Sequence, residues 1–208
     1  MSLKQLTIAA VVTLCIIVAP AAAQKNELSG IFGRTFISDQ GIQGAPSFDP
    51  KLRFGKGLTF EGNYARGLMG GDLASIFLEV PVVVNPDEDL HAAQNLIPEK
   101  YSSYFVTPAA RVNLFPQTAV SPWASFGGGV GHFSEGSTLE FGGKNPGKTG
   151  TTTGVVQAGL GLDVKFSGRF SLRGEVRDFW SGLPQLNVST GKSRQHNILV
   201  GGGIVWHF

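Results

Sequence analysis

Alternation of apolar and polar residues is the dominant pattern of this chain, and it is sharpest in residues 198–208. Counting back from Phe208, every second position there is apolar or glycine. A period of two is typical of a β-strand with one apolar face. The same alternation marks seven further predicted strands, at 27–36, 56–66, 73–84, 103–114, 122–133, 155–166 and 170–179.

The connections between these segments alternate in length. Long connections cover 37–55, 85–102, 134–154 and 180–196, and short ones cover 67–72, 115–121 and 167–169. A transmembrane barrel has short periplasmic turns, long outer loops and an even number of strands. A soluble sandwich has no reason to sort its loops in this way.

The face opposite the apolar stripe carries charge, on Glu61, Arg111, Asp163, Lys165, Arg173, Glu175 and Arg177. A soluble lipocalin-type barrel is apolar inside, so this much charge does not fit a greasy ligand cavity. Periodicity alone does not say which face is inside, and a β-sandwich with these charges in water stays an alternative. The sorting of the loops and the apolar end at Phe208 favour charges that line a lumen and an apolar stripe that faces lipid.

Residues 1–23 have the composition of a secretory signal peptide. Lys4 precedes an apolar run at 6–18, and small residues follow it, so we expect cleavage before Gln24. The run is too short for a transmembrane helix. The predicted domains are therefore the signal peptide, 1–23, and a barrel domain, 24–208.

The barrel domain is nearly neutral and has no cysteine, because Cys15 lies in the predicted signal peptide. A chain with 17 Lys and Arg against 15 Asp and Glu gives no case for nucleic-acid binding. No apolar stretch after residue 23 could form a helical span, and only helices and closed barrels satisfy their backbone groups in hydrocarbon. The predicted fold is an all-β, closed eight-stranded antiparallel transmembrane β-barrel.

The chain resembles the small bacterial outer-membrane β-barrel proteins of the OmpA and OmpX type, including the opacity-protein-like "porin family". The segments that carry the resemblance are 28–36, 57–66, 170–179 and 204–208. Ile204, Trp206 and Phe208 match the C-terminal assembly signal of that family. The resemblance implies a location in the bacterial outer membrane, contact with its lipids and lipopolysaccharide, assembly by the barrel-assembly machinery, and a monomer.

Two function classes stay open for such a barrel. One is a structural or surface-interaction protein with a plugged polar lumen and mobile extracellular loops, and the alternative is a narrow porin-like channel for small solutes. The interior of an eight-stranded barrel is just wide enough for side chains to fill. This favours a plug made of the lumen charges, and removal of Arg173 or Glu175 should then induce leakage.

A lipid A-modifying enzyme is a less favoured alternative. Deacylases among these barrels use a lipid-exposed His and Ser with an acidic partner, and a His-x-Ser arrangement is expected there. In this chain Ile198 takes the serine position after His196. The other histidines, His91, His132 and His207, lack metal-ligand spacing. We therefore predict no catalytic residue, no metal site and no cofactor.

Two local expectations complete the sequence analysis. Asn85 and Pro86 have the pattern of an N-cap and a first helical residue, which predicts a short loop helix with acidic residues at 87–89. Aromatic residues near strand ends are expected in girdles at the lipid–water interface, namely Tyr64, Tyr104, Trp123, Phe166, Phe170 and Trp180.

Replacement of Phe208 by a charged residue, or its deletion, should impair membrane assembly far more than the same change at His207. Phe208 lies on the apolar stripe, whereas His207 points to the other face. The measurement is the heat-modifiable protein recovered in the outer-membrane fraction. Equal insertion of both variants would show that the terminal residue is not acting as an assembly signal.

Overall fold

The computed structural model describes residues 26–45, 49–93 and 95–208. The predicted signal peptide lies outside the described residues. Within the part that is described, no helix is long and apolar enough to cross a membrane. The strands are β1 (Asn26–Phe36), β2 (Gln40–Gly41), β3 (Lys51–Phe54), β4 (Leu58–Gly70), β5 (Ala74–His91), β6 (Lys100–Val106), β7 (Ala109–Leu114), β8 (Val120–Glu135), β9 (Thr151–Lys165), β10 (Phe170–Gly182) and β11 (Arg194–His207).

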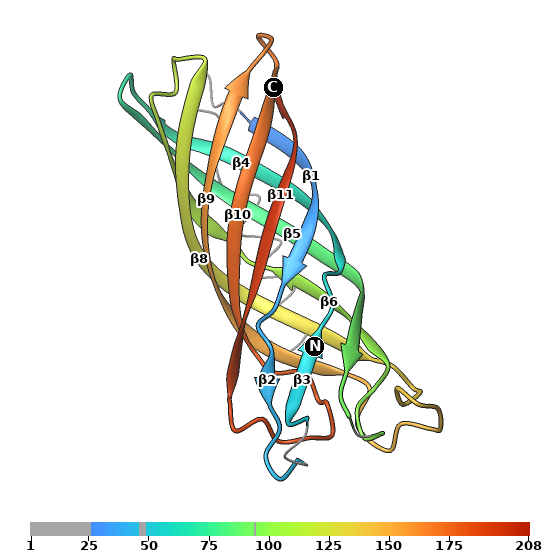
Figure 1. The fold of residues 1–208 in the computed structure, drawn as a ribbon. Coiled ribbons are helices and arrows are strands. Elements are labelled where there is room, and N and C mark those ends of the chain that lie inside the picture. Colours follow the sequence, from blue (N-terminus) through green and yellow to red (C-terminus); the bar gives the residue numbers. More distant parts are fainter. Residues whose placement is uncertain (1–25, 46–48, 94) are drawn as a thin grey trace, which may run out of the picture.

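Antiparallel pairing carries the chain around a ring of strands (Figure 1). On one side, β1 pairs with β4 and β4 with β5. On the other side, β1 pairs with β11, β11 with β10, β10 with β9 and β9 with β8. Between β5 and β8 lie β6 and β7, which form two halves of one strand interrupted at Thr107 and Pro108. The ring therefore has eight strand positions, as predicted, and each is paired on both sides.

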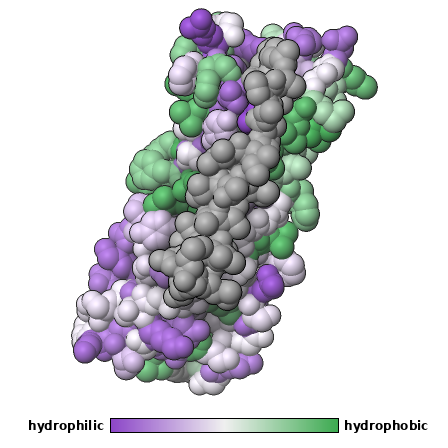
Figure 2. Space-filling model, turned by 180° about the vertical axis from the view of Figure 1, so that it is seen from behind, coloured by the Kyte–Doolittle hydropathy of each residue, from purple (hydrophilic) through white to green (hydrophobic). Residues whose placement is uncertain are grey.

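Outside the β-bulges, side chains alternate between the outer surface and the lumen. On β10 the outward Leu172 and Val176 are half exposed, whereas the inward Arg173 and Arg177 are buried. The outward apolar residues form a belt around the wall, and Figure 2 shows hydrophobic side chains along the flanks with hydrophilic ones at both ends. This is the inverse of a soluble barrel, and it confirms that the apolar stripe faces outward.

The two ends of the barrel differ as the connection lengths predict. The short turns lie at the end where β11 finishes, and the long connections lie at the opposite end (Figure 1). There β2 and β3 form a small hairpin within the first long connection, and β3 pairs with the last residues of β5. The strands thus continue beyond the apolar belt and support the outer loops.

The predicted loop helix at Asn85 is wrong, because β5 continues through this segment to His91. The register of β5 against β6 shifts between Asn85 and Glu88, which marks a β-bulge. The Asn85 amide donates to the buried Glu88 carboxylate at 2.9 Å, so it stabilises the bulge in place of a helix start. The backbone N–H of Gly57 donates to the same oxygen at 3.0 Å.

Replacement of Glu88 by Gln should stabilise the protein at pH 8 and have no effect at pH 4. Glu88 lies beyond the apolar belt, and burial raises the pKa of its carboxyl above the ordinary value. A raised pKa in the folded state means that stability is fully present below the unfolded pKa and is lost as pH rises through the folded pKa. The measurement is urea unfolding in detergent micelles at both pH values. The exposed Glu99, changed to Gln, is the matched control, and equal midpoints for wild type and Glu88→Gln at pH 8 would contradict the expectation.

Candidate functional site

The middle of the lumen is filled by buried ion pairs, and Arg177 on β10 lies at their centre. Its guanidinium contacts Glu79 at 2.7 Å, Glu175 at 3.0 Å and Glu61 at 3.3 Å. These four side chains come from β4, β5 and β10 and are fully buried. Arg177 therefore joins three strands of the wall, through charge-assisted hydrogen bonds to Glu79 and Glu175 and an ion pair with Glu61.

A second group of ion pairs lies next to the first, toward the short-turn end. Arg173 donates to both oxygens of Asp163 at 2.7 Å, which is the bidentate geometry that suits a guanidinium. Arg111 contacts Glu27 and lies 3.4 Å from Glu79, so it connects the two groups. Arg173 also lies 3.5 Å from Glu27. The three arginines and five carboxylates form one network, which we call the lumen network.

Trp123 lies inside this network, and its predicted place in an interfacial girdle is wrong. The side chain is buried, and its Nε1 donates to Asp163 at 3.2 Å. The guanidinium carbons of Arg173 and Arg177 each lie 5.0 Å from the ring centroid, and that of Arg111 lies at 5.8 Å. Strand alternation directs the Trp123 side chain inward. Its ring attracts the three guanidinium groups through cation–π interactions.

Six of the seven predicted lumen charges meet in the network, and Lys165 does not. Lys165 is exposed at the rim and donates to the backbone carbonyl of Pro116. The sequence analysis missed Glu27 and Glu79, which supply two of the five carboxylates. Both have the parity of the inward face of their strands, so alternation could have found them.

An apolar layer fills the lumen between the lumen network and the long loops. Phe105 stacks on Phe179 with ring centroids 5.1 Å apart and meets the edge of Phe133 at 5.8 Å. Tyr101 packs on Phe133 at 5.7 Å, and Leu199 of β11 is buried in the same cluster. These side chains come from β6, β8, β10 and β11, so this layer, here called the aromatic layer, spans the ring.

At the short-turn end the lumen opens into a cavity of about 850 Å³. Phe77 and the lumen-network residues Glu27 and Asp163 line its inner part, and Lys165 and Phe208 line its rim. The lumen therefore contains, in sequence, an open cavity, charged side chains and aromatic side chains.

The remaining predicted girdle residues lie on the outside of the wall. Tyr64, Tyr104, Phe166, Phe170 and Trp180 are all exposed, as are Trp206 and Phe208.

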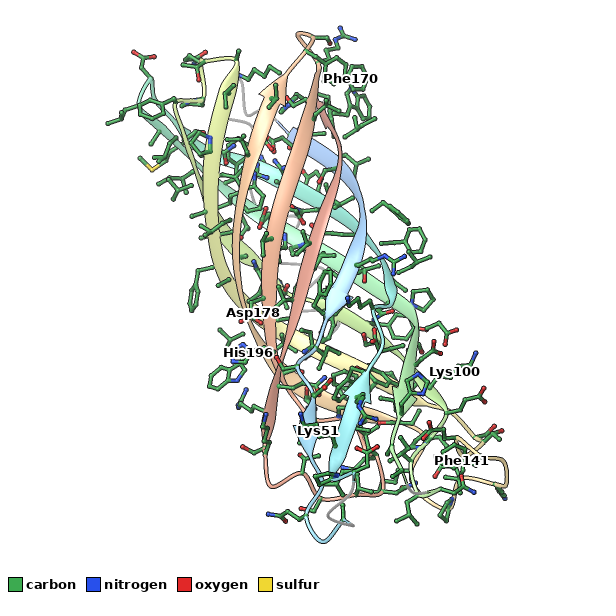
Figure 3. All side chains as sticks on the ribbon, in the orientation of Figure 1. Lys51, Lys100, Phe141, Phe170, Asp178 and His196 are labelled. Carbon is green, nitrogen blue, oxygen red and sulfur yellow. The ribbon has the colours of Figure 1, made fainter. Side chains whose placement is uncertain are left out.

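His196 lies beside the outward Trp180. The two rings stack at 6.2 Å, and His196 Nδ1 lies 2.6 Å from the Asp178 carboxylate. Figure 3 shows Asp178 and His196 next to each other at the outer wall. This contact pairs His196 with one carboxylate oxygen of Asp178, whose Oδ1 has no hydrogen-bond partner.

Gly161→Ala should destabilise the barrel by about 1–3 kcal/mol, the usual cost of overpacking. Gly161 pairs with Trp123 across β8 and β9, and a Cβ at Gly161 would overlap the indole ring. Gly174→Ala is the matched control, because a Cβ there meets open space on the outer face. The measurement is urea unfolding followed by gel mobility and tryptophan fluorescence. Equal loss in both variants would refute a specific role for the space beside Trp123.

Comparisons with known proteins agree with this architecture. No family model matches the chain, and no curated protein matches it. Among solved structures it is similar to the outer membrane protein OprG from Pseudomonas aeruginosa, with a TM-score of 0.54 and 12% identity over 89% of this chain and 96% of OprG. It is also similar to the Neisserial surface protein A, with a TM-score of 0.49, 13% identity and coverage of 91% and 100%. A third is the outer membrane enzyme PagL, with a TM-score of 0.42, 13% identity and coverage of 88% and 98%.

At this level of identity, likeness to OprG shows the fold and leaves the role open. The expected architecture is confirmed by the ring of strands and by the outward apolar belt. The chain has the fold of the small bacterial outer-membrane β-barrel proteins, and its exposed belt is that of a protein in the outer membrane.

Proposed function

We propose that the protein is an outer-membrane barrel with a plugged lumen that acts through the surface formed by its extracellular loops. The observation that carries this proposal is the lumen network. Its charged side chains are at most 5% exposed, although they line the interior of a barrel. Charges that line a water-filled pore would be solvated, whereas these contact one another in ion pairs.

The cost of burial explains why the network acts as a plug. A buried ion without a partner is strongly destabilising, and good geometry with several partners offsets the loss of hydration. Arg177 has three carboxylates in contact, and Arg111 and Arg173 have two each. Separation of these side chains to open a path would remove their compensation, so the plugged arrangement is favoured.

The aromatic layer is a second barrier in series with the first. Phe105, Phe133 and Phe179 are at most 1% exposed and contact one another across the lumen. Water and ions gain no hydrogen bonds from such a constriction. This layer changes the expectation for the plug, because loss of Arg173 or Glu175 alone would leave the aromatic barrier in place.

The long loops, expected to be mobile, are linked to one another by polar side chains. The Asn187 amide donates to Asn145 at 2.7 Å and to the Leu96 carbonyl at 3.1 Å. Ser189 Oγ donates to Gln43 at 2.8 Å. Three loops thus hold the fourth through polar side chains, whose tertiary contacts the sequence composition does not reveal. A fixed loop surface supports recognition of a partner better than four separate flexible chains.

The surroundings of the barrel follow from its outer surface. The belt of exposed apolar side chains fits a lipid environment, which in the outer leaflet contains lipopolysaccharide. Insertion by the barrel-assembly machinery and a monomeric state complete the proposal. Both rest on the ring of paired strands, which needs no second chain to satisfy its edges.

The wild-type protein in planar bilayers should show no stable open channel. Arg173→Ala and Glu175→Ala should stay closed, and each combined with Phe105→Ala and Phe179→Ala should conduct, because both barriers are then weakened. Leu172→Ala, an outward change on the same strand, is the control. Stable conductance by wild type would overturn the plug and favour the narrow porin-like channel.

A further inference from the structure

Ser171, His207 and Glu27 meet at the wall of the cavity at the short-turn end. Ser171 Oγ lies 2.9 Å from Nε2 of His207, and Nδ1 of the same imidazole lies 3.4 Å from Oε1 of Glu27. All three residues line the 850 Å³ cavity, with His207 partly exposed and Ser171 and Glu27 buried in its wall. They come from three neighbouring strands, β10, β11 and β1, so the fold alone brings them together.

The order of these contacts is that of a nucleophile, a general base and a group that orients the base. With Nδ1 protonated and facing Glu27, Nε2 can accept a hydrogen bond from the Ser171 hydroxyl. At 3.4 Å the Glu27–His207 contact is an ion-pair contact, longer than an ideal hydrogen bond. We propose that this constellation is a hydrolytic site for carboxylic esters with short acyl chains.

Glu27 is held in its orienting position by the lumen network. Its Oε2 contacts Arg111 and lies 3.5 Å from Arg173, which leaves Oε1 directed toward His207. A carboxylate fixed in this way keeps the imidazole in one tautomer and stabilises the imidazolium that forms during reaction. The buried charges of the plug thereby support a site at its edge, and Glu27 acts as a positioning residue.

The cavity defines the class of substrate. Its volume is within the range of small-molecule sites. Leu68, Met69 and Phe77 offer apolar surface for an acyl chain, and Asn113 and Lys165 offer donors for the carbonyl oxygen. The cavity opens at the end of the barrel with the short turns, which is the periplasmic end of such a fold.

The reaction balances with water as the only co-reactant. Ser171 Oγ forms a bond to the acyl carbon while its proton passes to His207 Nε2. The adduct expels the alcohol, which takes that proton and leaves an acyl-serine. Water then attacks the acyl-serine by the same proton route, which releases the carboxylic acid and restores Ser171.

The experiment uses the full barrel refolded in detergent micelles, with p-nitrophenyl butyrate as substrate and a fluorophosphonate as covalent probe. Wild type should hydrolyse the ester, and mass spectrometry of the labelled protein should place the adduct on Ser171. Ser171→Ala should lose the label and about 100-fold or more of kcat/KM. Ser29→Ala is the matched control, because Ser29 is another buried serine on a neighbouring strand and should leave the rate unchanged.

The two remaining residues have separable signatures. His207→Gln should slow both hydrolysis and labelling to the level of Ser171→Ala, and Glu27→Gln should lower kcat while KM stays unchanged. Heat-modifiable gel mobility identifies the variants that fold, and the position of the label on wild type needs no variant. Hydrolysis that survives Ser171→Ala, a label on another residue, or no hydrolysis by wild type would each overturn the proposal. None of these outcomes bears on conductance, so the plug is tested separately.

Discussion

Pairing of opposite charges inside a narrow ring is the interaction on which this structure depends. A strand that crosses lipid must direct every second side chain inward, and the polar groups removed from the lipid face therefore collect in the lumen. With eight strands the interior is too small to hydrate them. Arg111, Arg173 and Arg177 resolve this conflict by sharing five carboxylates and one indole ring.

The lumen is accordingly organised in layers along its length. An open cavity lies at the end with the short turns, the lumen network follows, and the aromatic layer lies below the outer loops. Each layer affects the solvation or the position of side chains in the next. The ion pairs are kept dry by aromatic side chains on one side, while on the other they fix Glu27 at the cavity wall.

The alternation in the sequence predicts the architecture well, because lipid imposes it on every strand. It predicts strand ends less well where the strands leave the membrane: β5 reaches His91 and β8 reaches Glu135, beyond the last outward apolar residues. Beyond the membrane the outward face can be polar and the inward face can be apolar, as at Leu90 and Phe133. The period-two contrast of the membrane segments is therefore lost. Trp123 was misplaced because its size and its position near a strand end suggested an interface, although its parity directs it inward.

The lumen network and the Ser171–His207–Glu27 constellation depend on distances between strands that are far apart in sequence. Alternation shows that these residues share a face, and it gives neither their height along the barrel nor their partners. Those depend on the stagger of the strands, which the pairing register fixes only after the ring has formed. The fold and most members of the lumen network were therefore predictable from one strand at a time, and the partners of these side chains were not.

The pairing of β1 with β11 has a kinetic consequence. These strands come from opposite ends of the described chain, and at their meeting point Asn26 and Phe208 exchange backbone hydrogen bonds of 2.7 and 2.9 Å. A contact with such sequence separation carries a large loop-closure entropy and forms slowly. Until it forms, both strands present unpaired edges that can template aggregation. Pairing of Asn26 with Phe208 is thus also the step at which an open sheet with aggregation-prone edges becomes a ring of paired strands.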